Sequence, residues 1–364
     1  MQSMMKMLLS ATRHCLFLTV FAITLVGSAS FAVKAQLGAP KDSPAQIAFV
    51  GQKDGQHSAI FLIDVDSQRQ LQLTDSKDNS LFGSWSPDGS QITFTSDRSG
   101  SWQIYVMNAD GQNVVQLTDL RPTAVNPIWS PDNKYIAFVA YKGETPDIFL
   151  MDVKTHSISN LTDNPAYDFL GTWSPDGKRL TFWTTRDETI GLYVTDIAGN
   201  EPIPLTKGVH VSPAELNHPV WSPDGTRIAF TGAPQDAKSD LYVIDADGSD
   251  LVNLTPDGRT FNLAPTWSPD GQSIAFVSAN QQNVAVEKIE VRTGKRSELN
   301  SSIKSCRYLA WSPDGQQIAC ITGGPNVESD IYAMDSDGSN LRQLTFTHTV
   351  KVSSDLPPLQ WRPR

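Results

Sequence analysis

The sequence of 364 residues has few cysteines and fewer basic than acidic residues. Its three cysteines form no CxxC pair, which excludes a disulfide-dense scaffold and a structural zinc site built from such pairs. Lysine and arginine number 29 against 39 aspartates and glutamates, giving a formal net charge of −10. Because binding nucleic acid requires a basic surface that neutralises phosphates, we expect no nucleic-acid partner.

Several catalytic motifs are missing as well. The chain contains no Gly-x-Ser-x-Gly nucleophile elbow, no HExxH and no GxxxxGK. No segment has a sustained i, i+3, i+4 apolar spacing, so we expect few helices. These absences argue against a serine peptidase, a zinc peptidase and a P-loop nucleotide hydrolase. We expect no catalytic residue, no cofactor and no bound metal.

The first 35 residues have the composition of a secretory signal peptide. They contain Lys6, Arg13 and Lys34, no acidic residue, and an apolar run from Cys15 to Gly27 that small residues follow. We therefore expect a signal peptide at 1–35, a short linker at 36–45, and a periplasmic or secreted protein that is not inserted in a membrane after cleavage. The alternative is an uncleaved anchor, because the run extended to Val33 is 19 residues long.

A repeated pentapeptide organises the rest of the chain. WSPDG or a close variant recurs at intervals of 44 to 50 residues, with a degraded last copy, at Trp85, Trp129, Trp173, Trp221, Trp267, Trp311 and Trp361. A period in the mid-forties is the length of a propeller blade. Four short apolar stretches accompany each copy, and the second alternates large, small and large residues, as in Ile136-Ala137-Phe138. Four antiparallel strands per unit predict an all-β propeller, a single domain at 46–364.

The number of blades follows from counting strands. The second-strand pattern occurs seven times if Ile47-Ala48-Phe49 and Ile318-Ala319-Cys320 are included. The chain then begins with the second strand of a blade and ends with the first strand of one. We expect residues 357–362 to complete the blade begun by residues 46–75, which closes a ring of seven blades and removes its open edges. A six-bladed ring with one non-closing unit is the alternative.

The aspartates of the hairpins are interpreted as turn residues. In Ser-Pro-Asp-Gly, proline presets the first turn position and glycine accepts a positive φ. Asp245-Ala246-Asp247-Gly248 has its glycine at position 4, whereas a calcium-binding EF-hand loop has it at position 6. Cys306 and Cys320 flank one hairpin and are predicted to lie almost opposite each other. A disulfide and a pair of buried thiols are equally compatible with this placement.

Connections between the second and third strands, and between blades, lie on one face of the ring, which we call the loop face. Binding residues concentrate on loops that a rigid scaffold displays, and aromatic and arginine residues are common interface anchors. For any single residue, packing beneath a loop or solvation is the commoner role. The candidate partner-binding residues are Arg98, Trp102, Lys142, Tyr167, Arg186, His210, His218, Arg307, Tyr308 and His348.

The tandem WSPDG, IAF, IYVMDADG-like and QLT segments resemble the propeller repeats of the TolB family of bacterial periplasmic proteins. The resemblance covers residues 46–364. In that family an α/β domain precedes a six-bladed propeller that binds a peptidoglycan-associated lipoprotein. Here the first strand begins about ten residues after the expected cleavage site, so we expect no leading α/β domain, and the blade count differs as well. Similar repeats occur in prolyl-oligopeptidase-like peptidases and oligogalacturonate lyases.

Two functions remain open. The resemblance and the loop-face residues favour a non-enzymatic, monomeric scaffold that binds an envelope protein or peptide, such as a lipoprotein. The alternative is a metal-assisted polysaccharide lyase or hydrolase that uses His210, His218 and His348. No carboxylate–histidine spacing supports a metal site, so we favour the binding scaffold.

Overall fold

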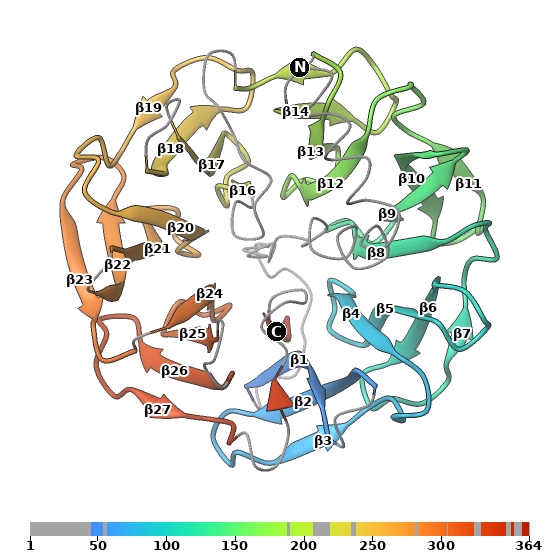
Figure 1. Ribbon diagram of the computed structural model, residues 1–364, viewed down its shortest axis with the longest axis horizontal. Coiled ribbons are helices and arrows are strands. Elements are labelled where there is room, and N and C mark those ends of the chain that lie inside the picture. Colours follow the sequence, from blue (N-terminus) through green and yellow to red (C-terminus); the bar gives the residue numbers. More distant parts are fainter. Residues whose placement is uncertain are drawn as a thin grey trace, which may run out of the picture.

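The computed structural model describes residues 45–53, 57–187, 190–206, 219–233, 238–280, 283–303, 305–323, 329–346, 351–352 and 359–363. These residues form seven β-sheets arranged as the blades of a ring (Figure 1). Every regular element among them is a strand. The predicted all-β propeller with seven blades is confirmed. The predicted signal peptide, and the linker up to residue 44, lie outside the described residues.

Six blades are built from four consecutive strands, the first innermost and the fourth outermost. The second to fourth blades comprise β4 (Ser80–Trp85), β5 (Gln91–Ser96), β6 (Gln103–Asn108), β7 (Val115–Gln116); β8 (Ala124–Trp129), β9 (Tyr135–Lys142), β10 (Thr145–Asp152), β11 (Ile158–Asn160); and β12 (Asp168–Trp173), β13 (Arg179–Thr184), β14 (Gly191–Asp196), β15 (Ile203–Pro204). The fifth to seventh comprise β16 (Val220–Trp221), β17 (Arg227–Gly232), β18 (Asp240–Asp245), β19 (Val252–Asn253); β20 (Phe261–Trp267), β21 (Ser273–Ala279), β22 (Val284–Glu290), β23 (Arg296–Asn300); and β24 (Cys306–Trp311), β25 (Gln317–Thr322), β26 (Ile331–Asp335), β27 (Arg342–Gln343).

The first blade joins the two ends of the described chain. Its later strands are β1 (Gln46–Gln52), β2 (Ala59–Asp64) and β3 (Gln70–Gln72), and its inner position is filled by β28 (Lys351–Val352) and β29 (Gln360–Trp361). Ile47 pairs with Trp361 in antiparallel register, and Gly51 pairs with Val352. The predicted closure is confirmed, and β28 extends it.

The second strands supply the most buried side chains. In β5, Ile92 and Phe94 are 0 % exposed and lie on the opposite face from Thr93. Phe94 stacks on Tyr105 of the third strand at 5.5 Å between ring centroids. Burying such a side chain contributes roughly 1.5–3 kcal/mol. The same pairing holds in four other blades, as Phe49–Phe61, Phe138–Phe149, Phe182–Tyr193 and Phe230–Tyr242.

The Ser-Pro-Asp-Gly turns are held by their own side chains. Ser86 Oγ donates to Asp88 Oδ1 at 2.6 Å, and the amide of Ser90 donates to the same oxygen at 3.0 Å. Burial raises the pKa of Asp88, but these hydrogen bonds outweigh it and keep that pKa below its ordinary value. Gly89 takes φ 66°, and Asn133 takes φ 64° at the equivalent position after Ser130. The turn aspartates are therefore backbone acceptors.

Indole groups connect neighbouring blades. Trp173 Nε1 donates at 3.2 Å to the carbonyl of Ile128, the residue before the tryptophan of the preceding blade. The same bond joins Trp85 to Gln360, Trp221 to Thr172, Trp267 to Val220, Trp311 to Thr266 and Trp361 to Ala310. The guanidinium groups of Arg179, Arg227 and Arg362 cover the tryptophan rings of the next blades, Trp221, Trp267 and Trp85.

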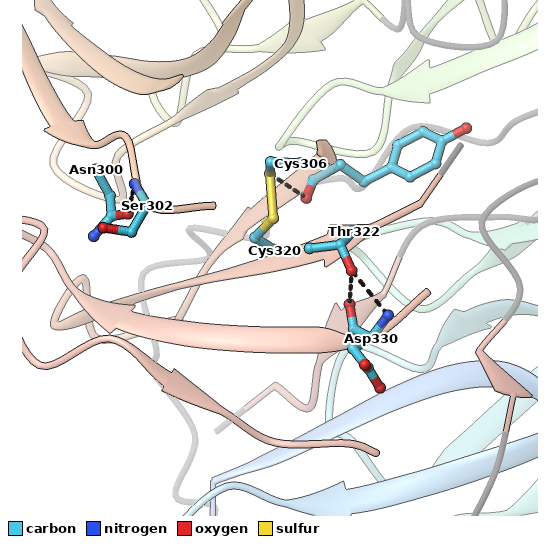
Figure 2. The surroundings of a disulfide bond; sticks show 7 residues. Asn300, Ser302, Cys306, Cys320, Thr322 and Asp330 are labelled. Atoms are coloured by element: carbon cyan, nitrogen blue, oxygen red, sulfur yellow. Dashed lines mark hydrogen bonds between the residues drawn. A yellow bond between two sulfur atoms is a disulfide. The ribbon is translucent and has the colours of Figure 1, made fainter. Parts of the chain in front are cut away.

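A disulfide joins Cys306 of β24 to Cys320 of β25 in the seventh blade (Figure 2). Cys320 takes the place that phenylalanine occupies in the other blades and is 0 % exposed. It lies opposite Tyr332 of β26, where an aromatic pair would otherwise form. The covalent link therefore replaces a buried ring. No helix within the described residues is long and apolar enough to cross a bilayer.

Deleting residues 357–364 should destabilise the whole propeller, because it removes β29 and reopens the first blade. Loss of the buried Trp361 side chain alone should cost about 3–5 kcal/mol. Trp361→Phe should cost only about 1 kcal/mol, because it keeps the strand and removes one hydrogen bond. Thermal unfolding measures both. An unchanged midpoint after the deletion would contradict closure through β29.

Reducing the disulfide should lower the unfolding free energy by about 3 kcal/mol, the effect of releasing a loop of this length; the cysteines are 14 residues apart. Urea unfolding with and without a thiol reductant measures the difference. A Cys306→Ala, Cys320→Ala variant should not respond to the reductant. An equal response in both proteins would show that the reductant acts elsewhere.

Candidate binding face

The two faces of the ring carry different connections. One carries the Ser-Pro-Asp-Gly turns and the hairpins between third and fourth strands. The other is the loop face; its described connecting residues are 53, 57–58, 73–79, 97–102, 117–123, 143–144, 161–167, 185–187, 190, 205–206, 219, 233, 238–239, 254–260, 280, 283, 301–303, 305, 323, 329–330 and 344–346. Because the sheets fix the ends of each connection, side chains beside a strand end have defined positions.

The exposed aromatic side chains of the described residues belong to the loop face. Tyr167 is 45 % exposed, Phe261 is 47 % and Phe346 is 41 %. Tyr167 and Phe261 occupy the same position in the repeat, six residues before Trp173 and Trp267. The remaining exposed large apolar residues are aliphatic and lie on or beside outermost strands: Leu71, Val114, Val115, Ile158, Ile203, Leu251 and Val252. Phe346 was not among the candidates from sequence.

The backbone holds Tyr167 firmly. Its amide donates to Thr185 Oγ1 at 3.0 Å, and the amide of Thr185 donates to its carbonyl at 3.2 Å. Tyr141, the penultimate residue of β9, is half-buried; burial raises the pKa of its phenol, and the charge of Tyr167 raises it further.

Arg98 and Arg186 lie on the loop face, but their side chains cover buried rings. The Arg98 guanidinium is 5.1 Å from the Phe94 centroid and 5.0 Å from that of Tyr105. Arg186 has the same relation to Phe182 and Tyr193, at 5.0 and 5.3 Å. In each case Nε donates at 3.1 Å to a hydroxyl at the end of the second strand. Both arginines therefore close a blade interior and stabilise it.

Asp168 gives Arg186 an additional role. The Asp168 side chain is 0 % exposed and lies 3.4 Å from Arg186 Nη2. Burial raises the pKa of Asp168; Thr184, Thr162 and Arg186 oppose that rise, and the nearby Asp147 charge adds to it. Arg186 is thus the compensating cation of a buried carboxylate.

Tyr308 does not lie in a surface loop as expected. It is 2 % exposed and belongs to β24, where it joins the apolar core shared by the seventh and first blades. The register of β24 shifts between Cys306 and Tyr308, so Arg307 is the extra, partly buried residue of a bulge that turns Tyr308 inward. Trp102 is half-buried. It packs against the core between the first and second blades and against the core between the third and fourth.

The remaining candidates from sequence are one lysine and three histidines, for which the structure gives no side-chain contact. Lys142 is the last residue of β9. His210, His218 and His348 lie outside the described residues. Within the described ranges, no three or more histidine, cysteine, aspartate or glutamate side chains are grouped so as to hold a metal ion.

The sixth blade contains a charged cluster that the sequence did not reveal. Arg296 of the outermost strand lies over Phe276 at 5.2 Å, ion-pairs with Glu287 and reaches Asp257 at 3.6 Å. Glu287 pairs in register with Phe276, where other blades have an aromatic residue. Its hydrogen bonds to Arg296 raise the pKa of that guanidinium. The acidic residue at an aromatic position was the available signal.

Replacing Arg186 with methionine should cost about 3–5 kcal/mol, because the Asp168 carboxylate stays buried without its cation. The pKa of folded Asp168 would then rise further above the unfolded value, so stability is lost as pH rises through that window. The destabilisation should therefore be larger near pH 7.5 than near pH 4.5 in thermal unfolding. Arg98→Met is the matched control, since the Arg98 guanidinium covers the same kind of ring pair but donates to the hydroxyls of Ser96 and Ser80 instead of a buried carboxylate. Equal, pH-independent losses in both variants would contradict the role of Asp168.

Solved structures with the same fold have diverse activities. An oligogalacturonate lyase in complex with manganese is 17 % identical, with a TM-score of 0.63, and the alignment covers 84 % of this chain and 86 % of that one. TolB from Acinetobacter baumannii is 19 % identical, with a TM-score of 0.52 and coverage of 91 % and 89 %. A puromycin hydrolase is 12 % identical, with a TM-score of 0.65 and coverage of 88 % and 57 %. At these identities the likeness shows the fold alone.

Comparison with curated proteins gave no match. The sequence does match the family described as TolB beta propeller domain, over residues 24–118, 106–262 and 226–358. The overlapping matches cover most of the chain and all seven blades. The resemblance seen in the repeats is therefore confirmed, and the chain belongs to the TolB β-propeller domain family.

Proposed function

We propose that this protein is an exported, monomeric scaffold that binds a protein or peptide of the cell envelope through its loop face, without catalysing a reaction. The observation that carries the proposal is the exposure of the Tyr167 and Phe261 rings, which occupy the same position in the repeat, where the innermost strand of a blade begins. Rigid aromatic anchors lose little conformational entropy on binding, and they are frequent hot spots of interfaces.

Two features support export. The first 35 residues have the basic, apolar and small-residue segments of a signal peptide. The disulfide between Cys306 and Cys320 is of a kind that persists in oxidising compartments.

Affinity capture from an envelope extract tests the proposal with three baits. The loop-face bait carries Tyr167→Ala and Phe261→Ala; the control bait carries Ile203→Ala and Val252→Ala, which truncate exposed residues of outermost strands. The wild type and the control should enrich one protein that the loop-face bait loses. Truncating a hot spot costs about 2 kcal/mol or more, or at least about thirtyfold in affinity.

The competing function is metal-assisted cleavage of a polysaccharide with His210, His218 and His348. Incubation with oligogalacturonate and Mn²⁺ should give no unsaturated product if the protein is a binding scaffold. Metal-dependent cleavage that is lost when the three histidines are replaced would contradict the proposal. So would a partner whose capture does not depend on Tyr167 and Phe261.

A further inference from the structure

Hydrogen bonds on the loop face tie the start of β20 to the start of β18 in the neighbouring blade (Figure 1). The backbone amide of Asn262 donates to the carbonyl of Ser239 at 2.9 Å, and Asn262 Nδ2 donates to the same carbonyl at 3.2 Å. Ser239 Oγ donates in return to the carbonyl of Asn262 at 3.1 Å. The Asn262 side chain is buried. The residues that precede these two, Lys238 and Phe261, are therefore held at defined positions by a rigid junction.

The Lys238 ammonium lies beside the exposed ring of Phe261. Lys238 Nζ is 5.8 Å from the ring centroid and donates to the carbonyl of Arg259 at 2.5 Å. Phe261 is 47 % exposed and Lys238 is half-buried. An ammonium has three N–H donors, and the carbonyl of Arg259 uses one of them. A cation with donors to spare and an open aromatic surface therefore meet at one point of the loop face.

The carboxylates of this junction are committed to other groups. Glu287 and Asp257 both form ion pairs with Arg296. Asp240 is 5 % exposed and lies below the surface, where the side chain of the outer strand donates to it. Among the described residues, none of these carboxylates forms an ion pair with Lys238. The charge of Lys238 is therefore not neutralised by this part of the chain.

The repeat does not require a lysine at this position. Lys238 lies three residues before Leu241, a third-strand residue that strand pairing aligns with its counterparts in the other blades. The equivalent residues of those blades are His57, Ser101, Thr145, Thr189, Asn283 and Glu328. Arg259, in the connection that Lys238 contacts, is exposed as well. A chain with a net charge of −10 thus places two cations next to an exposed ring.

We infer that Lys238 and Phe261 bind a carboxylate of the partner polypeptide together with the apolar residue next to it. This inference rests on the proposed function and names the chemistry recognised at one part of the same face. The carboxylate accepts a hydrogen bond from the Lys238 ammonium, and a bond between two charged groups is about twice as strong as a neutral one. The apolar residue covers the ring of Phe261 and removes its surface from water. Acidic side chains and the C-terminus of a chain offer the same acceptor, so the experiment separates these two sources.

Fluorescence anisotropy of three labelled Gly/Ser peptides tests the inference on the full protein. The first peptide carries Leu-Glu pairs and an amidated C-terminus, and the second carries Leu-Gln pairs and the same amide. The third carries Leu-Gln pairs and ends in a leucine with a free carboxylate. The first or the third should bind about tenfold more tightly than the second, because only they offer a carboxylate beside an apolar side chain. The tighter of the two identifies the source of the carboxylate.

Substitutions assign the selectivity to the two residues. Lys238→Met should weaken binding of the carboxylate peptide about tenfold without changing the affinity for the second peptide, and Lys238→Arg should retain most of the binding. Phe261→Ala should weaken all three peptides, because it removes the apolar contact. Lys295→Met is the matched control: it removes one positive charge from an exposed lysine on the opposite face and should bind like the wild type.

Thermal unfolding should confirm that every variant is folded. Equal binding of the three peptides, no binding of any of them, or unchanged selectivity in Lys238→Met would overturn the inference. An equal loss in Lys295→Met would trace the effect to net charge and would overturn it too. Those outcomes leave the proposed function standing if affinity capture still yields a partner that depends on Tyr167 and Phe261. Failure of the capture together with Lys238-dependent peptide binding would separate the two claims in the opposite sense.

Discussion

The hydrogen bond from a tryptophan indole to the carbonyl of the preceding blade is the contact on which the ring depends. Each donor ends an inner strand, and each acceptor lies one residue before the previous tryptophan, so a single residue type both ends its own strand and fixes the neighbouring sheet. The bond from Trp85 to Gln360 joins positions 275 residues apart and connects the second blade to the first. Closure is therefore made by the same contact that joins most consecutive blades. The junction of the second and third blades differs, because the Trp129 indole is buried without a hydrogen-bond partner and its backbone amide donates to Ser84 Oγ.

The arginine contacts divide the two faces of the ring. On the face that carries the Ser-Pro-Asp-Gly turns, Arg179, Arg227 and Arg362 cover the tryptophan of the next blade. On the loop face, Arg98 and Arg186 instead cover the aromatic pair within their own blade. Both arrangements shield rings that would otherwise meet water at the ends of the sheets. These arginines therefore stabilise the blades, whereas the rings of Tyr167, Phe261 and Phe346 stay exposed on the loop face.

The repeat made most of the fold predictable from sequence, because strand order and turn chemistry recur in every unit. The same regularity could not place side chains where a blade departs from it. Tyr308 was expected in a loop, yet a bulge at Arg307 turns it into the core. Arg98 and Arg186 lie on the loop face, as the sequence predicts. The sequence does not show that their side chains cover the rings of Phe94 and Phe182 in their own blades. The pairing of Cys306 with Cys320 depended on the separation of two backbones, which residue spacing alone leaves open.

Departures from the repeat are the residues on which the proposed recognition is based. A position that tolerates glutamine, aspartate and alanine in other blades is not constrained by packing, so an aromatic residue there needs a separate cause. Tyr141 meets this condition, and Tyr167 occupies a position that holds asparagine, threonine and serine in other described blades. Trp85 and its equivalents do not, because every blade needs them. The repeated residues explain why the loop face is rigid, and the residues that depart from the repeat are those to which we assign the proposed role in binding.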